Sequence, residues 1–360
     1  MFGKIKALKR KYRKRQDMAK WKEVITHNFK DLEVRRKLSK EQKKEVQDYY
    51  QDMIGQKVDL YCHEYFYSRT GYFTKDYVPT NLYHTELVPR ANDNSLVKAY
   101  CDKNVCDLLF PGENVAHNVL KNMHGYYYFE GKAVSYEDAV RLCANLKDVI
   151  IKPAMRSKGK GVQLLNFTDG KNEKGETVEQ VFKQYKVDFL IQRRVRQHPA
   201  MAALNPTSLN TIRVLSYRSG MEVLIIYSVI RIGRQGQIVD NQSAGGISTA
   251  ISEDGVLDKA AFGGYSTDNV LQTDSGIVLE GYKVPSYDKA LDMVRRMHLN
   301  LPYLNLVGWD IAIEEDGSPI LIEINTNPGL SQSAFKSGMG KYTERIIREL
   351  WPRRNTKFRG

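Results

Sequence analysis

The stretch WDIAIEEDGSPILIEINTNPGLSQSA occupies residues 309–334. Two apolar segments, 308–317 and 319–325, meet at the turn Glu-Asp-Gly-Ser. Segments of this kind, joined by a short turn that contains glycine, are typical of a β-hairpin with antiparallel strands. The hairpin is the most informative element that this sequence predicts.

Three polar side chains interrupt the hairpin: Asp310, Glu323 and Asn325. Strand pairing can place Asp310 opposite Glu323, and Glu323 and Asn325 share a face because they are two residues apart. Three oxygen ligands on one face suit Mg²⁺, which takes one or two carboxylates and completes its shell with water and phosphate oxygens. The alternative is a hydrogen-bonded polar patch at a sheet edge.

A second segment, DVIIKPAMRSKGKGV at 148–162, predicts a strand that delivers Lys152 into a loop with Ser157, Gly159 and Gly161. Bare backbone N–H groups in such a loop can close over phosphates, while the lysine binds them as a point charge. A glycine-rich hairpin turn with a surface lysine is the alternative.

A third segment, FLIQRRVRQHP at 189–199, predicts a strand that ends in a short connection. The connection can offer backbone N–H and C=O groups to an adenine edge. In chain order, the three segments describe a phosphate lid, an adenine hinge and a metal hairpin. Together they predict a nucleotide site.

The bulk composition points to a cytoplasmic protein of two or three domains, since the 360 residues include 42% apolar residues. No run is long and apolar enough to span a membrane, and the N-terminus is too charged for a signal peptide. The four cysteines lack metal-ligand spacing and are expected to be reduced thiols.

The formal charge of +13 belongs mainly to residues 1–45, which hold 17 Lys or Arg and 6 Asp or Glu. Within this segment, KIKALKRKYRKR at 4–15 contains eight basic residues and no acid. Residues 1–20 therefore predict a helix that either lies on an anionic membrane surface or is simply solvated. Phosphate-mediated binding of nucleic acid is a third reading, but no sequence-specific recognition motif accompanies it.

The rest of the chain alternates strand-like runs with turns and has a helical stretch at 286–299, which predicts an α+β fold with mostly antiparallel sheets. We expect five regions along the chain. They are a basic helical segment at 1–55, a substrate-side domain at 56–145, a small subdomain with lid and hinge at 146–200, a large subdomain with the metal site at 201–350, and a basic tail at 351–360.

The ordered set of segments resembles the ATP-grasp superfamily, and most closely its sugar-transfer associated branch, over residues 95–335. The most specific part is the spacing Asp310-x12-Glu323-x-Asn325 followed by TNPG. The resemblance implies two α+β subdomains that clamp ATP, with Mg²⁺, two ions in all, at the hairpin and Mn²⁺ as the alternative metal.

The resemblance also implies roles for further residues. Lys103 and Lys152 would contact phosphates, Ser157 to Gly161 would form the lid, and Gln192, Arg193 and Val195 would form the hinge. Many relatives place a carboxylate after the hinge to hold the ribose, but residues 193–210 contain no acid. The residues Gln197, His198 or Asn205 would then substitute.

Arginines and glycine-rich segments complete the expected site. Arg213 and Arg231 lie on strands before the hairpin, where family members place cations near the transferred phosphate or the substrate carboxylate, and the alternative is an arginine on the solvent face of a strand. The segments 240–249 and 325–333 offer N–H groups and hydroxyls for a carboxylate or sugar hydroxyl, or are plain turns. The candidates for substrate contacts are Asn241, Gly245, Gly246, Gly329 and Ser331.

The function implied by the resemblance is an ADP-forming ligase that joins a carboxylate to an amine through an acylphosphate. The branch resembles proteins of surface polysaccharide assembly, so an amino acid and a sugar or glycan are the expected substrates. The basic N-terminal helix would suit peripheral attachment at the inner membrane face. The alternatives are a small-molecule kinase and a membrane or nucleic-acid docking protein with a non-catalytic nucleotide site.

Overall fold

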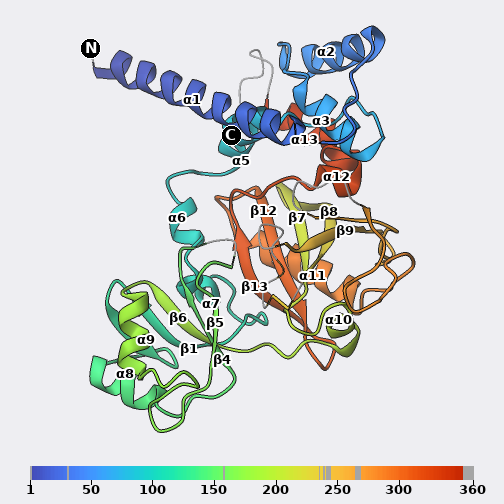
Figure 1. The fold of residues 1–360 in the computed structure, drawn as a ribbon. Coiled ribbons are helices and arrows are strands. Elements are labelled where there is room, and N and C mark those ends of the chain that lie inside the picture. Colours follow the sequence, from blue (N-terminus) through green and yellow to red (C-terminus); the bar gives the residue numbers. More distant parts are fainter. Residues whose placement is uncertain are drawn as a thin grey trace.

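Two antiparallel β-sheets, one of six and one of seven strands, form the framework of the computed structural model (Figure 1). The structure describes residues 2–30, 32–156, 159–234, 236–237, 240, 245–263 and 269–351, with the backbone alone for residues 2–11, 13 and 14. Every pair of neighbouring strands in the described sheets is antiparallel. The predicted α+β class with antiparallel sheets is confirmed.

The six-stranded sheet has the strand order β3-β2-β1-β6-β4-β5. Helices α8 and α9 bury their apolar faces against it, with Phe182 stacked on Tyr127 and packed against Phe189. Ser135 and Thr177 cap the first turns of these two helices. The elements are β1 Asn118–Met123, β2 Tyr126–Phe129, β3 Lys132–Val134, α8 Tyr136–Cys143, β4 Val149–Pro153, β5 Gln163–Leu165, α9 Val178–Tyr185 and β6 Phe189–Arg193.

This sheet changes one predicted domain limit. Strands from residues 118–134 and from residues 149–193 belong to the same sheet, so the boundary predicted near residue 145 falls inside it. The reason is the pairing of β1 with β6, which joins segments about 70 residues apart and leaves no local pattern in the sequence. The other predicted limits remain proposals.

The seven-stranded sheet has the order β11-β10-β9-β8-β7-β12-β13. It contains the hairpin that the sequence predicts, with the turn at 314–318 between β12 and β13. The connection from the small sheet contains α10 Pro199–Leu204. The strands are β7 Thr211–Ser219, β8 Glu222–Ile232, β9 Ile247–Ile251, β10 Ala261–Gly263, β11 Asn269–Val270, β12 Leu306–Ile313 and β13 Pro319–Asn325.

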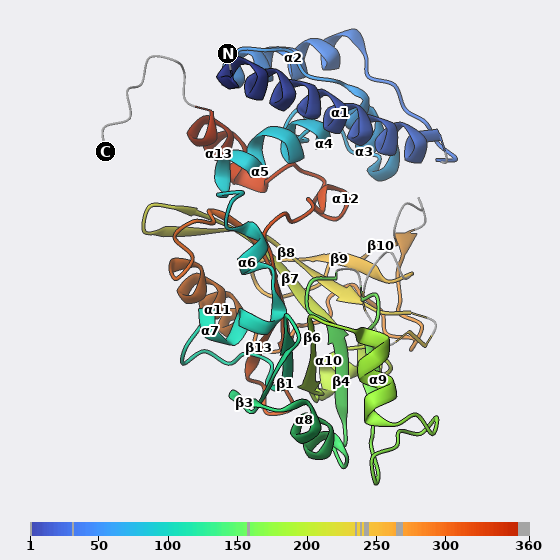
Figure 2. The same cartoon turned by 90° about the vertical axis from the view of Figure 1, so that its left-hand side faces the viewer.

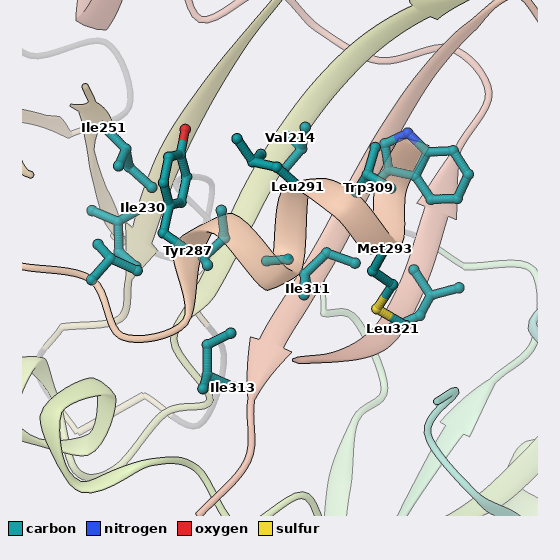
Figure 3. Packing of buried hydrophobic residues seen from close by; sticks show 14 of the residues in the cluster. Val214, Ile230, Ile251, Tyr287, Leu291, Met293, Trp309, Ile311, Ile313 and Leu321 are labelled. Atoms are coloured by element: carbon teal, nitrogen blue, oxygen red, sulfur yellow. The ribbon is translucent and has the colours of Figure 1, made fainter. Parts of the chain in front are cut away.

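Helix α11 Tyr287–Leu299 covers one face of the large sheet, as the apolar periodicity of 286–299 predicts. Figure 3 shows Leu291 and Met293 of this helix among the sheet residues Val214, Ile311 and Leu321. These side chains and Trp309 belong to one buried cluster. Burial of Trp309 also requires a partner for its indole N–H, which donates to Ser216 Oγ at 2.7 Å.

Helices from both ends of the chain pack on one end of the other face of the large sheet (Figure 2). Val46 and Tyr50 of α2 and Ile346 and Ile347 of α13 share one cluster with Tyr217 of β7. Gly55 ends α2 in the left-handed conformation, as expected for a residue that closes a helix. The elements are α1 Phe2–Lys30, α2 Lys40–Ile54, α3 Tyr61–Thr70, α4 Thr80–Leu82, the π-helix η1 Tyr83–Leu87, α5 Val88–Ala91, α12 Gln332–Phe335, η4 Gly340–Tyr342 and α13 Thr343–Leu350.

The segment between the helical region and the small sheet is built from short helical turns, α6 Val97–Tyr100, η2 Lys103–Val105 and α7 Cys106–Leu109. The basic N-terminal segment forms the long helix α1, whose C-terminal half contacts α3 and α4. Its other end projects beyond the rest of the molecule in Figure 1. No described helix has the length and apolarity that crossing a membrane requires. All four cysteines are free thiols, as predicted.

Candidate functional site

A cavity of about 430 Å³ lies between the two sheets. The small sheet supplies Lys152 and Gln192 to its lining, and the large sheet supplies Asp310 and Glu323. The lining combines charged groups with apolar side chains, and the apolar side chains suit a planar ring. These apolar side chains, called the apolar wall below, include Ile150, Val162, Leu164, Val195, Leu209 and Ile322.

The hairpin brings its polar residues together as the sequence predicts. Asp310 pairs with Glu323 across β12 and β13, and Gly308 pairs with Asn325. The register shifts just after Asp310, so an irregularity in the ladder lies beside the charged residues. Gly308 is required for close packing, because a Cβ atom at this position would lie 2.9 Å from Pro328 Cβ and 3.4 Å from Asn325 Cβ.

Two arginines hold Asp310. Arg213 Nη2 donates to Asp310 Oδ2 at 2.8 Å and its Nε donates to Oδ1, while Arg231 Nη1 donates to Oδ2 at 3.1 Å. Burial alone would raise the pKa of Asp310, but the two guanidinium groups outweigh it and hold the pKa well below its usual range. Asp310 is therefore ionised at any physiological pH.

Two lysines face the same part of the cavity. Lys152 is buried, and its Nζ donates to Gln192 Oε1 at 2.9 Å, while Lys103 Nζ lies 3.1 Å from Glu323 Oε2. Burial lowers the pKa of Lys152 to about 8, although Glu323 acts in the opposite direction. Two cations and two carboxylates thus converge here, an arrangement suited to phosphate groups and their counter-ion.

A family described as sugar-transfer associated ATP-grasp matches residues 82–347, which include both sheets and the cavity between them. The chain belongs to the sugar-transfer associated ATP-grasp family. No curated protein matches the chain.

Several solved structures are similar to this ATP-grasp chain. The ATP-grasp ligase PsnB, complexed with minimal precursor, Mg and ADP, is 14% identical, with a TM-score of 0.40 over 72% of this chain and 60% of that chain. An L-amino acid ligase from Bacillus licheniformis is 10% identical, with a TM-score of 0.38 over 69% and 48%. The biotin carboxylase domain of the Hydrogenobacter thermophilus 2-oxoglutarate carboxylase is 12% identical, with a TM-score of 0.43 over 74% and 49%. The chain spans about half to three fifths of the length of these structures.

The hairpin of this ATP-grasp protein has a donor set that fits Mg²⁺. Asp310 and Glu323 supply carboxylates, and the side-chain nitrogen of Asn325 is buried without a hydrogen-bond partner among the described residues. The Asn325 amide is therefore free to turn its oxygen toward a cation. In the part of the chain that the structure describes, no three His, Cys, Asp or Glu side chains form a metal-binding group, so phosphate and water oxygens must complete the shell.

Some of the residues expected in the hinge and the lid line the cavity, and others do not. Gln192 points into the cavity and donates to Ala116 O at 3.0 Å, and Val195 and Gly159 also line the cavity. Arg193 does not line it, because successive side chains of β6 point to opposite faces. The prediction that Arg193 belongs to an adenine hinge concerns its backbone groups and stays a prediction. The Arg193 guanidinium lies 3.8 Å from Glu130.

Other expected contacts lie beside the cavity or outside the described residues. Gly161 borders the lid with a φ of 78°. Gly245 and Gly246 precede β9 without lining the cavity, and Ser157 and Asn241 fall outside the residues that the structure describes. Tyr227 Oη holds the loop after the hairpin, since it donates to Gly329 O at 3.0 Å and accepts from Ser331 N–H at 2.8 Å. Gly329 and Ser331 are thus fixed near the hairpin and outside the cavity.

The three proposed substitutes for a ribose carboxylate are engaged in the protein itself. Gln197 lines the cavity, but its Nε2 donates to Ser208 O at 2.7 Å. His198 Nδ1 caps α10 by accepting from Ala200 N–H at 3.1 Å, and Asn205 Nδ2 donates to Ser208 Oγ at 3.0 Å. None of the three is a ready ribose ligand in this arrangement.

Two polar residues, one at the cavity wall and one beside the loop after the hairpin, were not predicted from the sequence. Asp240 is buried at the cavity wall, where Arg231 Nη2 donates to its Oδ1 at 2.8 Å. His84 of η1 lies 3.0 Å from Asn327 Oδ1, in the loop after the hairpin, and its ring stacks on Trp21 of α1 at 4.0 Å. The pairing of His84 with Asn327 spans 243 residues, so no local pattern could have revealed it. Asp240 could have been noticed as the acid that opens the glycine-rich segment 240–249.

Proposed function

We propose that this protein is an ATP-dependent ligase that joins a carboxylate to an amine through an acylphosphate. The observation that carries the proposal is the convergence of Lys152, Lys103 and the Asp310–Glu323 hairpin at one cavity between two sheets. Membership of the ATP-grasp family supports it.

In this proposal the apolar wall of the cavity binds the adenine ring, and Lys103 and Lys152 bind the phosphates. Asp310, Glu323 and Asn325 would hold Mg²⁺ or Mn²⁺, and the bound cation would supply neutralisation of phosphate charge. Arg213 and Arg231 line the path of the transferred group and stabilise the negative charge that develops on it.

The chemistry takes two steps. A carboxylate oxygen of the substrate attacks the γ phosphorus and the bond to the bridging oxygen breaks, which gives an acylphosphate and ADP. The amine then attacks the acyl carbon, phosphate leaves, and the proton of the amine passes to solvent. The chain contributes mainly positioning and charge balance, because this mechanism needs no nucleophile from a protein side chain.

The finer proposal concerns the substrates and the place of action. We assign the carboxylate to an amino acid or similar group and the amine to a sugar or glycan intermediate of surface polysaccharide biosynthesis. The basic residues of 1–20 would hold the protein at the anionic inner face of the membrane, as a cytoplasmic peripheral protein.

In the deciding experiment the protein is incubated with Mg-ATP and a library of amino acids, nucleotide sugars and amino sugars. Phosphate release is then measured, and the products are identified by mass analysis. Free phosphate together with an amide product is the expected result. Phosphate retained on a product would instead identify a kinase. If Mg-ATP gives the wild type no protection against thermal unfolding, the nucleotide proposal is wrong and a docking function is left.

A further inference from the structure

Lys103 lines the cavity, and its ammonium group already has three acceptors in the protein. Its Nζ donates to Arg156 O at 2.9 Å and to Ala154 O at 3.5 Å, and it lies 3.1 Å from Glu323 Oε2. These three acceptors match the three N–H donors of an ammonium group. Lys152 differs, because the described structure gives its Nζ one acceptor. Lys152 therefore has donors to spare for a phosphate, whereas Lys103 already holds the chain.

The backbone that carries Lys103 is fixed to the small sheet. Lys103 N–H donates to Ala154 O at 3.3 Å, and Asn118 Nδ2 of β1 donates to Lys103 O at 3.4 Å. The next residue, Asn104, is buried, and its Nδ2 donates to Asn122 O of β1 at 3.2 Å. The Lys103 side chain itself is only 14% exposed. Its ammonium group is therefore held in place, unlike that of a solvated surface lysine.

The other end of this contact, Glu323, belongs to the large sheet. Its strand, β13, pairs with β12 on one edge. On the other edge Ala116 N–H donates to Leu321 O at 2.9 Å, and Leu321 N–H donates to Asn114 O at 2.9 Å. Glu323 thus stands on a strand whose backbone is hydrogen-bonded along both edges. Lys103 ties the chain that leaves β4 to this strand.

The Arg156 carbonyl belongs to the segment 154–156, which leads from β4 toward the expected lid. Ala154 is buried, but Arg156 is exposed and lines the cavity. Among the described residues, the Lys103 ammonium is the one donor to Arg156 O. The Lys103 contact thus lies where the cavity wall continues beyond β4. Residues further along this part of the chain that also line the cavity are Gly159, Lys160, Val162 and Leu164.

We propose that Lys103 is a positioning residue that anchors segment 154–156 to Glu323 before a nucleotide binds. This role comes in addition to the phosphate contact of the proposed function. With the segment held, the part of the cavity wall that follows β4 is in place when the base arrives, so less ordering is needed on binding. The effect on nucleotide affinity rests on the proposed function, whereas the anchor itself is a property of the ligand-free protein.

Cleavage by an arginine-specific protease tests the anchor without any ligand. The protease must draw the carbonyl oxygen of Arg156 into its own oxyanion hole, so the bond after Arg156 is protected while Lys103 holds that oxygen. For Lys103→Met we expect cleavage after Arg156 to be about tenfold faster, because a hydrogen bond from a charged group is lost. Lys103→Arg keeps N–H donors and should restore most of the protection. Mass spectrometry of the fragments identifies the bond that is cut.

Two controls separate the anchor from a general loss of structure. The side chain of Arg141, on α8, is 72% exposed, and cleavage after Arg141 should keep its wild-type rate in Lys103→Met. Lys98→Met, on α6, removes the same charge from an exposed position outside the cavity lining. It should leave cleavage after Arg156 unchanged.

Adenosine tests the consequence for the cavity, because it has no phosphate. Its binding is followed by ligand-detected nuclear magnetic resonance. For Lys103→Met we expect the dissociation constant of adenosine to rise about threefold to tenfold, since the cavity wall must then be ordered on binding. A lysine that acts on phosphate alone would leave the adenosine affinity unchanged. Lys98→Met is again the control.

Each outcome supports or overturns the inference. Wild-type cleavage after Arg156 in folded Lys103→Met, or an equal acceleration after Arg141, overturns the anchor. Unchanged adenosine affinity in this variant, or a wild type that binds Mg-ADP but not adenosine, overturns the positioning role and leaves the proposed function intact. If the wild type binds neither ligand, the proposed function is wrong, and the cleavage rates still decide whether Lys103 anchors the segment.

Discussion

Arg213 and Asp310 are cross-strand partners on β7 and β12, and the guanidinium group of the first binds both carboxylate oxygens of the second. This pair has a structural role and a place in the candidate metal site. It joins two neighbouring strands of the large sheet, and it occupies the carboxylate on which the candidate metal site depends. Stability and ligand binding are therefore coupled at this pair.

Replacement of Asp310 by asparagine is expected to lower the free energy of unfolding by about 3–5 kcal/mol, because the buried Arg231 and the partly buried Arg213 lose their shared counter-charge. Urea denaturation measures the effect. Asp292→Asn is the matched control, since its pairing with Arg295 is exposed and is expected to contribute less than about 1 kcal/mol. If the two variants have equal free energies of unfolding, the ion pairs of Asp310 with Arg213 and Arg231 do not stabilise the fold more than the exposed pair does.

Lys152 gives a prediction about pH. Its pKa in the folded protein is about 8, below the ordinary value of 10.5, so the folded state releases the Lys152 proton before the unfolded state does. The unfolding free energy of the ligand-free protein should therefore gain a favourable contribution as pH rises from about 8 to about 10, and this contribution should be absent in Lys152→Met. Denaturant titrations across this range measure it.

Nucleotide affinity should change in the opposite sense. As pH rises past about 8, Lys152 loses the charge that binds phosphate, so ADP affinity should fall in the wild type and stay flat in Lys152→Met. At pH 7 the variant should bind ADP about 10- to 100-fold more weakly than the wild type, the usual effect of losing a charged hydrogen bond. A pH-independent ADP affinity in the wild type would argue against contact between Lys152 and phosphate.

The apolar wall of the cavity can be tested at Leu164, which lines the cavity although it is 42% exposed. Leu164→Asp should lower nucleotide affinity about tenfold or more, because a carboxylate replaces apolar contact with the ring and repels the phosphates. Its thermal stability should change little. The control is Leu108→Asp, at a site that is 69% exposed and outside the cavity, and it should leave affinity unchanged.

Gly308 makes close packing of the hairpin and the following loop possible. The added Cβ of Gly308→Ala would crowd Pro328 and Asn325, so the loop must shift, at a cost of about 1–3 kcal/mol. The shift of the loop should also weaken metal-dependent nucleotide binding. Gly263→Ala is the comparison, because its Cβ would meet only an ordinary contact, Ile247 Cγ2 at 3.9 Å. If Gly308→Ala and Gly263→Ala lower the free energy of unfolding by similar amounts, the close contacts at Gly308 are not the cause of the loss.

A variant of His84 tests whether the loop after the hairpin, which His84 contacts at Asn327, contributes to turnover. Burial lowers the pKa of His84, so the neutral ring bonds to Asn327 in the loop after the hairpin. His84→Ala should reduce turnover about tenfold while nucleotide affinity stays within about threefold, because the cavity itself is untouched. Trp21→Ala removes the stacking on His84 but keeps the hydrogen bond, so its effect should be smaller. A loss of nucleotide affinity in His84→Ala would contradict this assignment.

The sequence by itself determined the local elements and the pairing of two carboxylates in one hairpin. The strands at 149–153, 189–192 and 210–218 and the helix at 286–299 appear close to where apolar patterning places them, because side-chain period reflects burial. The facing of Asp310 and Glu323 followed from turn position and strand alternation, which are local properties. Lys152 was also predicted from a local segment, whereas Gln192 was implied by the family resemblance.

Only the tertiary structure decided which of these groups meet. The pairing of β1 with β6 joined residues 118–134 and 149–193 in one sheet, and the alternation of side chains along β6 turned Arg193 away from the cavity. The register of β7 with β12 placed Arg213 beside Asp310, and Arg231 of β8 lies between Asp310 and Asp240. His84 reached Asn327 across 243 residues. The physical reason is that strand pairing and ion pairing act between segments that are distant in sequence, so their partners are chosen by the packed fold and leave no periodic trace along the chain.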